Sequence, residues 1–170
     1  IKGNSSMWWT AATNFGIEYA LRNGASYILT LNNDTIADTN YIHHLIGAYE
    51  NAPGNSLIGS SAIDANTQKV IYRGERLKWL SETSIFMKDI VVERPENGLI
   101  RVTHFPGRGL LIPRNVFKTI GLFDEDNFPH YMADYDFTLR AVKSGFDIYC
   151  SWNAIISTYP EASSANQLKL

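Results

Sequence analysis

The strongest restriction on the fold comes from a short apolar run that is bounded by polar residues. Residues 27–31 read Tyr-Ile-Leu-Thr-Leu, follow Gly24, and lead directly into Asn32-Asn33-Asp34. A nearly continuous apolar run of this length is typical of a strand that is buried on both faces, and such a strand needs helices on both sides of its sheet. The sequence therefore predicts an α/β domain with a polar cluster at the carboxyl end of a buried strand.

The segments on either side of this run favour the same class. Residues 10–23 have the apolar content of a helix that ends at Asn23-Gly24. Asp38 is a candidate cap for a second helix, whose apolar side chains recur at helical spacing until Pro53-Gly54, and another strand begins at Leu57. Helices and strands that alternate through short connections predict right-handed crossovers in a mostly parallel sheet.

The second half of the chain has a different pattern before helices return. Short β-like pieces separated by Gly, Pro and Asn-Gly predict a small antiparallel insertion within 61–105. Beyond it, one strand, a helix that starts at Pro113, another helix and two short strands are expected. We therefore expect one domain over residues 1–160 and a polar tail over 161–170. The expected ranges are 70–72, 77–80, 90–92 and 99–102 for the insertion, then 110–112, 113–120, 133–144, 146–149 and 154–156.

Composition restricts the partners and the compartment. The 170 residues are 45% hydrophobic, which suits one globular core. The formal charge of -2 and the lack of a basic cluster argue against a nucleic-acid partner. The sequence has no apolar stretch of membrane-spanning length, no signal-peptide pattern and a single cysteine, Cys150. We therefore expect no transmembrane segment in this chain and a cytoplasmic location, compatible with peripheral attachment to the inner face of a membrane.

The polar cluster after the first strand is a candidate metal site. Open α/β sheets bind ligands at the carboxyl ends of their strands, which is where Asn32 and Asp34 are expected to lie. Their oxygens are hard ligands suited to Mg²⁺ or Mn²⁺ carrying a diphosphate. The same residues also suit a turn in which Asn and Asp bond their own backbone, so both interpretations stay open.

A second candidate lies at the start of the helix near residue 133. Asp134 and Asp136 follow His130, and a group-transfer enzyme needs one carboxylate within reach of the acceptor proton. Asp134 is the residue that we expect to act as this base. The alternatives are a helix cap for Asp134 and an i, i+4 ion pair with Arg140 for Asp136.

Two further motifs have features of a ligand site. Gly107 and Gly109 would let the backbone approach a ligand, and Arg108 between them has the fork that binds phosphate or carboxylate. A bend whose Arg pairs with a surface acid is the alternative. Trp8 and Trp9 could stack on a sugar or could simply pack in the core, and we expect at least one of them to be substantially exposed.

Taken in order, these segments resemble glycosyltransferase family 2 over almost the whole chain. That family has an Asn-containing loop, an Asn-x-Gly helix, a strand that ends in a metal motif, a Gly-containing strand before a helix, a Gly-x-Phe-Asp-Glu phrase, and a Glu-Asp-x-Asp element with downstream Arg and Gly. The matching segments are Gly3-Asn4, Asn14-Phe15-Gly16, Leu31 to Asp34, Gly109 to Arg114, Gly121 to Glu125, and Ala133 to Asp136 with Arg140 and Gly145.

The resemblance implies a GT-A (Rossmann-like) fold and a role such as polysaccharide biosynthesis. It implies a nucleotide-sugar donor, a saccharide or lipid-linked acceptor, and an inverting displacement. Asp134 would be the base, and Asp34 with help from Asn32 would hold a divalent metal, Mg²⁺ or Mn²⁺, that stabilises the departing diphosphate. The substrate-binding residues would be Trp9, Asn14, Gly107, Arg108, Gly109, His130 and Asp136.

The sequence departs from the family in three places. Asn32 stands where the metal motif usually has an Asp, and Ala133 stands where a Glu usually precedes the base. The family also begins with a strand, a helix and a strand that bind the nucleotide, and we expect that this portion is missing before Ile1.

Two other functions fit parts of the pattern. One is a catalytically incomplete carbohydrate-binding or interaction domain. The other is a metal-dependent nucleotidyltransferase, which would require a Gly-rich phosphate loop near its N-terminus. The enzyme interpretation predicts that Asp34 and Asp134 face one crevice.

Overall fold

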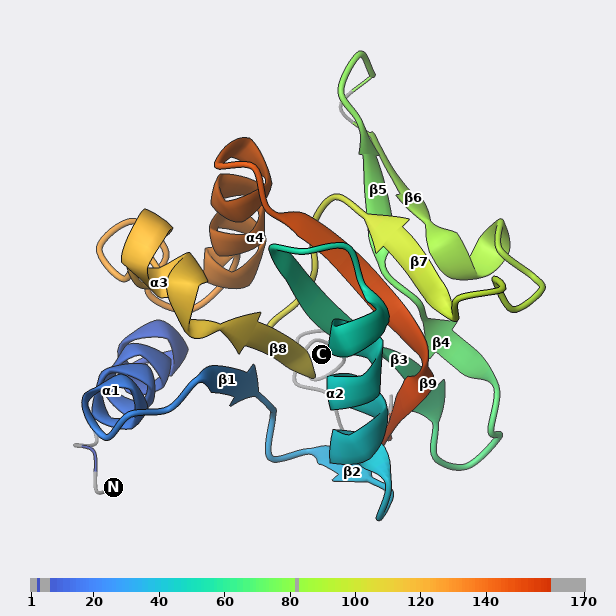
Figure 1. Cartoon of the computed structure of the whole chain (residues 1–170), viewed down its shortest axis with the longest axis horizontal. Helices are drawn as coiled ribbons and strands as arrows, with labels where there is room; N and C mark the ends of the chain where they lie inside the picture. The colour runs from blue at the N-terminus through green and yellow to red at the C-terminus, as the bar shows by residue number, and fades with distance from the viewer. Residues whose placement is uncertain (1–2, 4–6, 82, 160–170) are drawn as a thin grey trace, which may run out of the picture.

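The computed structural model describes residue 3, residues 7–81 and residues 83–159 (Figure 1). Helices and strands alternate along the first part of the chain, as the sequence predicts, and the α/β class is confirmed. The elements are α1 (Trp9–Arg22), β1 (Tyr27–Thr30), β2 (Thr35–Ala37), α2 (Tyr41–Asn51), β3 (Ser56–Asp64), β4 (Val70–Tyr72), β5 (Glu75–Lys78), β6 (Thr83–Phe86), the 3₁₀ helix η1 (Met87–Asp89), β7 (Leu99–Val102), β8 (Leu110–Pro113), α3 (Arg114–Ile120), α4 (Ala133–Lys143) and β9 (Asp147–Thr158).

One mixed sheet forms the centre of the molecule. Its strand order is β1-β8-β3-β9-β2, with β4 also paired to β3 and β7 to β9. Strands β1, β3 and β9 point the same way, as a parallel-type sheet predicts, because β8 is antiparallel to both β1 and β3, and β3 is parallel to β9. Adjacent strands are nevertheless mostly antiparallel. Strand β8, which follows the insertion in the chain, lies between β1 and β3 and runs opposite to both. Among the described strands, β3 and β9 make the single parallel pair.

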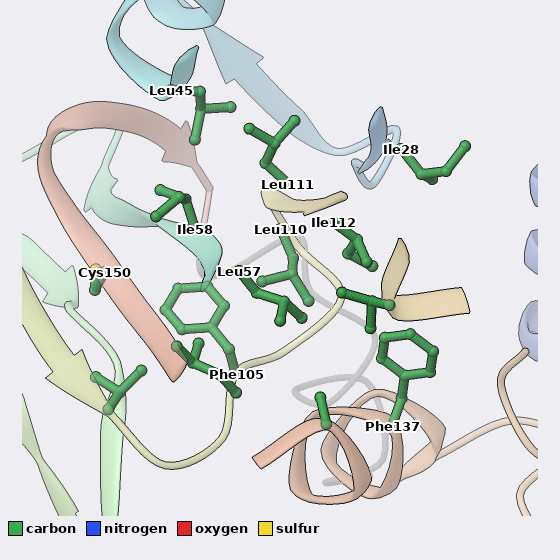
Figure 2. Close-up of a cluster of buried hydrophobic side chains, with 14 of the residues drawn as sticks. Ile28, Leu45, Leu57, Ile58, Phe105, Leu110, Leu111, Ile112, Phe137 and Cys150 are labelled. Carbon is green, nitrogen blue, oxygen red and sulfur yellow. The ribbon is translucent and has the colours of Figure 1, made fainter. Parts of the chain in front are cut away.

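Helices cover both faces of this sheet, which explains why side chains on both faces of its central strands are buried. Figure 2 shows Ile58 and Leu111 pointing toward Leu45 of α2, whereas Leu57, Leu110 and Ile112 point to the opposite face, where Phe137 of α4 lies. All these side chains are buried. Each such Leu or Ile contributes about 1.5–3 kcal/mol by leaving water, so the core holds both layers on the sheet.

The predicted insertion is present, and its details differ from the prediction. Strands β5 and β6 form a separate antiparallel hairpin that projects from the body (Figure 1). The strand expected over 77–80 begins earlier, at Glu75, and Trp79 and Leu80 lie in the exposed turn. The strand expected over 90–92 is wrong, because the Val91 N–H bonds to the Met87 carbonyl at 2.8 Å and continues the turn of η1.

Three other local expectations need correction, and one strand was not predicted. The two strands expected at 146–149 and 154–156 are one strand, β9, because a bulge at residues 152–154 lets it stay paired with β3 on both sides. Strand β2 was not expected at all. Asp38 does not cap α2, since its Oδ1 accepts from the Asn40 N–H at 2.7 Å in the preceding turn. Pro113 is the last residue of β8 rather than the first of α3.

Two expected features lie outside the described residues, namely the contribution of Asn4 to the first loop and the polar tail over 161–170. In the part of the chain that the structure describes, no helix combines the length and the apolar character needed to cross a bilayer.

Candidate functional site

A pocket of about 350 Å³ lies at the end of the sheet where β1 finishes and β8 begins. It brings together six residues that the sequence nominated, from the start of α1, the turn after β1, the loop before β8 and the start of α4. The lining residues are Trp9, Asn32, Pro106, Gly107, Arg108, His130, Tyr131, Met132, Asp134 and Tyr135.

Strand pairing brings these distant segments together. Thr30, the last residue of β1, is opposite Leu110, the first residue of β8. The Gly109 N–H also bonds to the Thr30 carbonyl at 2.8 Å, which extends the contact into the loop before β8. The turn that contains Asn32 and the loop that contains Arg108 therefore meet at one edge of the sheet, where α/β folds bind ligands.

Asp134 lies in the first turn of α4 and is held at both carboxylate oxygens. Oδ2 accepts the Gly107 N–H at 2.8 Å, and Oδ1 accepts the Tyr135 N–H at 3.0 Å. Met132, the residue before the first residue of the helix, has a φ of 70°, which is in the left-handed region that is uncommon for residues other than glycine. Such strain often occurs at functional sites. Asp134 is thus more than a helix cap, because it also joins α4 to the loop before β8.

The two glycines around Arg108 are required by close packing. A Cβ at Gly107 would lie 2.8 Å from the Trp9 ring. Gly109 has a φ of 75°, and a Cβ there would lie 2.9 Å from the Ser60 hydroxyl oxygen. Arg108 lines the pocket between them, and no ion pair of Arg108 occurs among the described residues. The alternative of a bend with an ion-paired Arg is therefore not supported.

The candidate metal ligands occupy a turn beside the pocket. Asn32 lines the pocket, whereas Asp34 is exposed and is not part of the lining. The turn is closed by the Thr35 N–H and hydroxyl, which both bond to the Asn32 backbone carbonyl, at 3.3 and 2.6 Å. The bonds that close the turn are thus made by the Asn32 backbone carbonyl and by Thr35. They do not involve the side chains of Asn32 and Asp34, as the alternative of an Asn- and Asp-bonded turn would require.

The turn after β1 offers oxygen atoms of the type that Mg²⁺ or Mn²⁺ prefers. Within the described residues there is no group of three or more His, Cys, Asp and Glu side chains that could hold a metal. A diphosphate-bound Mg²⁺ or Mn²⁺ needs only one or two protein ligands, because phosphate and water oxygens complete its shell. The carboxylate of Asp34 and the amide oxygen of Asn32 are donors of the right type for that arrangement.

Four predicted site residues are not part of the pocket lining, namely Asp34 and Gly109, which are described above, and Asn14 and Asp136. Asn14 is buried, and its amide donates to the Phe123 carbonyl at 2.9 Å and accepts from the Phe123 N–H at 3.1 Å, so it fastens α1 to the following loop. Asp136 accepts from Arg140 Nε at 2.7 Å, which is the i, i+4 pair that the sequence left open. Trp8 is 61% exposed, as expected for one of the two tryptophans, and its ring lies 5.2 Å from that of His130.

Sequence reasoning did not nominate four lining residues, Pro106, Tyr131, Met132 and Tyr135. Three of them, Tyr131, Met132 and Tyr135, lie within two residues of His130 or Asp134 in the chain. This proximity to predicted site residues is the feature of the sequence that could have pointed to them. Tyr135 matters electrostatically, since burial and then the nearby Glu75 carboxylate raise the pKa of its phenol. The phenol therefore stays protonated and acts as a hydrogen-bond donor.

The comparison with solved structures defines the class of fold. The chain matches the crystal structure of GalNAc-T7 with UDP, GalNAc and Mn²⁺ with a TM-score of 0.66 and 12% identity, over 93% of this chain. The fold is therefore GT-A-like, and the match spans 31% of that longer chain.

The family follows from the sequence itself. The family model described as glycosyl transferase family group 2 matches residues 27–164, which is most of the chain, and the chain belongs to this family. No curated protein gives a significant sequence match.

Proposed function

We propose that this chain carries the acceptor-side machinery of an inverting glycosyltransferase that moves a sugar from a nucleotide diphosphate to an acceptor hydroxyl. One observation supports this most directly. The Asp134 carboxylate is held by two backbone N–H groups, at 2.8 and 3.0 Å, inside the pocket that Asn32 also lines. A base must be fixed within reach of the proton that it takes, and this arrangement provides a fixed carboxylate.

The proposed reaction is a single displacement. The acceptor oxygen forms a bond to the anomeric carbon while the bond from that carbon to the diphosphate oxygen breaks, and the electron pair leaves with the nucleoside diphosphate. The acceptor proton moves to a carboxylate oxygen of Asp134. Attack from the face opposite the leaving group inverts the anomeric configuration.

The turn after β1 and the loop before β8 suit the diphosphate. Asp34 and Asn32 would hold a divalent ion, whose chemical contribution is to stabilise the negative charge on the departing diphosphate. Arg108 lines the same pocket and has the planar donor fork that binds phosphate oxygens. GalNAc-T7, which shares the fold, was crystallised with UDP, GalNAc and Mn²⁺, and this supports a nucleotide diphosphate and a divalent ion as ligands here.

A saccharide or lipid-linked acceptor is the proposed second substrate, used at the cytoplasmic face of a membrane. Large side chains gather at the rim of the pocket. Trp8 is 61% exposed, Tyr131 62% and Met132 54%. Aromatic rings beside a polar pocket suit the apolar faces of sugar rings.

The test is a transfer assay on the full-length protein with uridine, guanosine and thymidine diphosphate sugars, saccharide and lipid-linked acceptors, and Mg²⁺ or Mn²⁺. We expect release of the nucleoside diphosphate and a product whose anomeric configuration, measured by NMR, is inverted. Retention of configuration would contradict direct displacement with Asp134 as base. Saccharide binding without turnover of any donor would instead support the carbohydrate-binding or interaction domain.

A further inference from the structure

A buried polar cluster lies directly behind the pocket wall. Glu75 of β5 and His104 of the loop after β7 are each only 7% exposed, and Oε2 of Glu75 lies 3.2 Å from Nε2 of His104. The other Glu75 oxygen accepts a hydrogen bond from the Tyr135 hydroxyl at 3.1 Å. Tyr135 lines the pocket, whereas Glu75 and His104 do not.

The charge states of this cluster follow from its contacts. Burial opposes ionisation of Glu75, but the hydrogen bond and charge of His104 and the hydrogen bond of Tyr135 outweigh it and hold the pKa of Glu75 below its ordinary value. Because an ionised carboxylate can only accept hydrogen bonds, His104 donates through Nε2 and Tyr135 through its hydroxyl. Both bonds are therefore charge-assisted, which makes them the stronger kind.

The backbone around Glu75 keeps the carboxylate in place. The Thr103 N–H bonds to the Glu75 carbonyl at 3.0 Å, and the Leu77 N–H bonds to the Thr103 hydroxyl at 2.7 Å. These bonds fasten the base of the β5–β6 hairpin to the body. The His104 ring also meets the Tyr135 ring edge-on, with centroids 5.0 Å apart.

Stability alone does not explain a buried carboxylate here. An apolar side chain of similar size usually packs at least as favourably as a buried ion pair. The group that Glu75 holds, however, is the neighbour of Asp134 in the chain, and the Tyr135 N–H donates to Asp134 Oδ1 at 3.0 Å. Tyr135 is thus fixed by Glu75 at its phenol and joined to Asp134 at its backbone.

We propose that Glu75, oriented by His104, is a positioning residue that acts through the Tyr135 hydroxyl to fix the acceptor-side wall of the pocket and the orientation of Asp134. This inference rests on the proposed glycosyl transfer. It assigns to the β5–β6 insertion a part in acceptor use, because β5 supplies the carboxylate. The donor diphosphate is expected at Asn32 and Arg108, and among the described residues neither of these side chains hydrogen-bonds to Glu75 or Tyr135.

The kinetic test is a double-mutant cycle in the full-length protein. Glu75→Gln and Tyr135→Phe should each lower kcat/KM for the acceptor by about 10-fold, the effect of losing one charge-assisted hydrogen bond, and leave the KM for the donor unchanged. The double variant should be no worse than either single variant, because both remove the same contact. Asp147→Asn is the matched control, since its carboxylate accepts from Arg101 Nε at 3.1 Å away from the pocket, and it should keep wild-type kinetics.

Additive losses, or a lower melting temperature with acceptor kcat/KM within about twofold of wild type, would overturn the positioning role. If Glu75→Gln does not fold, Tyr135→Phe still tests the same hydrogen bond, and wild-type acceptor kinetics for this variant would also overturn the role.

A second readout does not depend on turnover. A fluorotyrosine at position 135 should give one sharp ¹⁹F resonance that shifts or broadens in Glu75→Gln and stays unchanged in Asp147→Asn. An unchanged resonance in Glu75→Gln would refute the inference even for an active enzyme. Conversely, the expected spectral change in a protein that transfers no sugar would leave the positioning contact standing and would refute the proposed function alone.

Discussion

Replacing Asp134 by Asn separates the chemistry of the site from its folding. The amide keeps the size and shape of the carboxylate but cannot accept a proton. It also offers one acceptor oxygen in place of two, so either the Gly107 or the Tyr135 N–H loses its partner. A hydrogen bond to a charged group contributes about 1.5–3 kcal/mol. Because Asp134 is only half-buried and water can replace the lost partner, we expect the lower end of this range.

The expected stability change is modest and measurable. About 1.5 kcal/mol corresponds to a fall in Tm of roughly 3–6 °C for a domain of this size. Loss of a general base should lower kcat by roughly 10²-fold or more, because the interaction exists in the transition state, and should leave donor KM nearly unchanged.

Steady-state kinetics with varied donor, together with thermal melts, measure both quantities. Asp147→Asn, outside the pocket, provides the comparison for a lost carboxylate and should keep wild-type kcat. A kcat for Asp134→Asn within about threefold of wild type would remove Asp134 as the base.

Three further results are expected. Asp34→Asn should weaken binding of Mn²⁺ with the donor by roughly tenfold, because a divalent site loses a carboxylate charge. Asp38→Asn is the control and should bind Mn²⁺ and the donor as the wild type does. Equal affinities of the two variants, measured by calorimetry, would exclude Asp34 as a ligand. Gly109→Ala should lower the free energy of unfolding by about 2–4 kcal/mol in urea titrations, because a φ of 75° disfavours a side chain and a Cβ would lie 2.9 Å from the Ser60 hydroxyl oxygen. Gly16→Ala inside α1 is the control and should not destabilise the protein. An unchanged urea midpoint for Gly109→Ala would contradict the close packing. Burial raises the pKa of the Cys150 thiol to about 12, so Ellman's reagent at pH 8 should label it only after unfolding, and rapid labelling of the folded protein would show that the thiol is accessible.

Local signals in the sequence were sufficient for most elements and for the centre of the site. Helix α1 ends at Arg22 and α4 ends at Lys143, each one residue before the predicted end, because a helix terminus depends mainly on a few neighbouring residues. Chain order and residue type likewise nominated Asn32, Arg108 and Asp134, and all three line one pocket. The prediction that Asp34 and Asp134 face one crevice is not confirmed, because Asn32 lines the pocket together with Asp134, whereas Asp34 is exposed and is not part of the lining.

The tertiary structure decided the features that depend on residues far apart in the chain. The position of β8 between β1 and β3 and the continuous pairing of β9 across its bulge are set by which strands can be buried together, and local propensity does not contain that information. The Glu75–His104–Tyr135 cluster joins positions 29 and 60 residues apart. Each of these side chains is ordinary in its own stretch of sequence, and only burial at one place turns them into a hydrogen-bonded unit, because buried polar groups must find their partners within the fold.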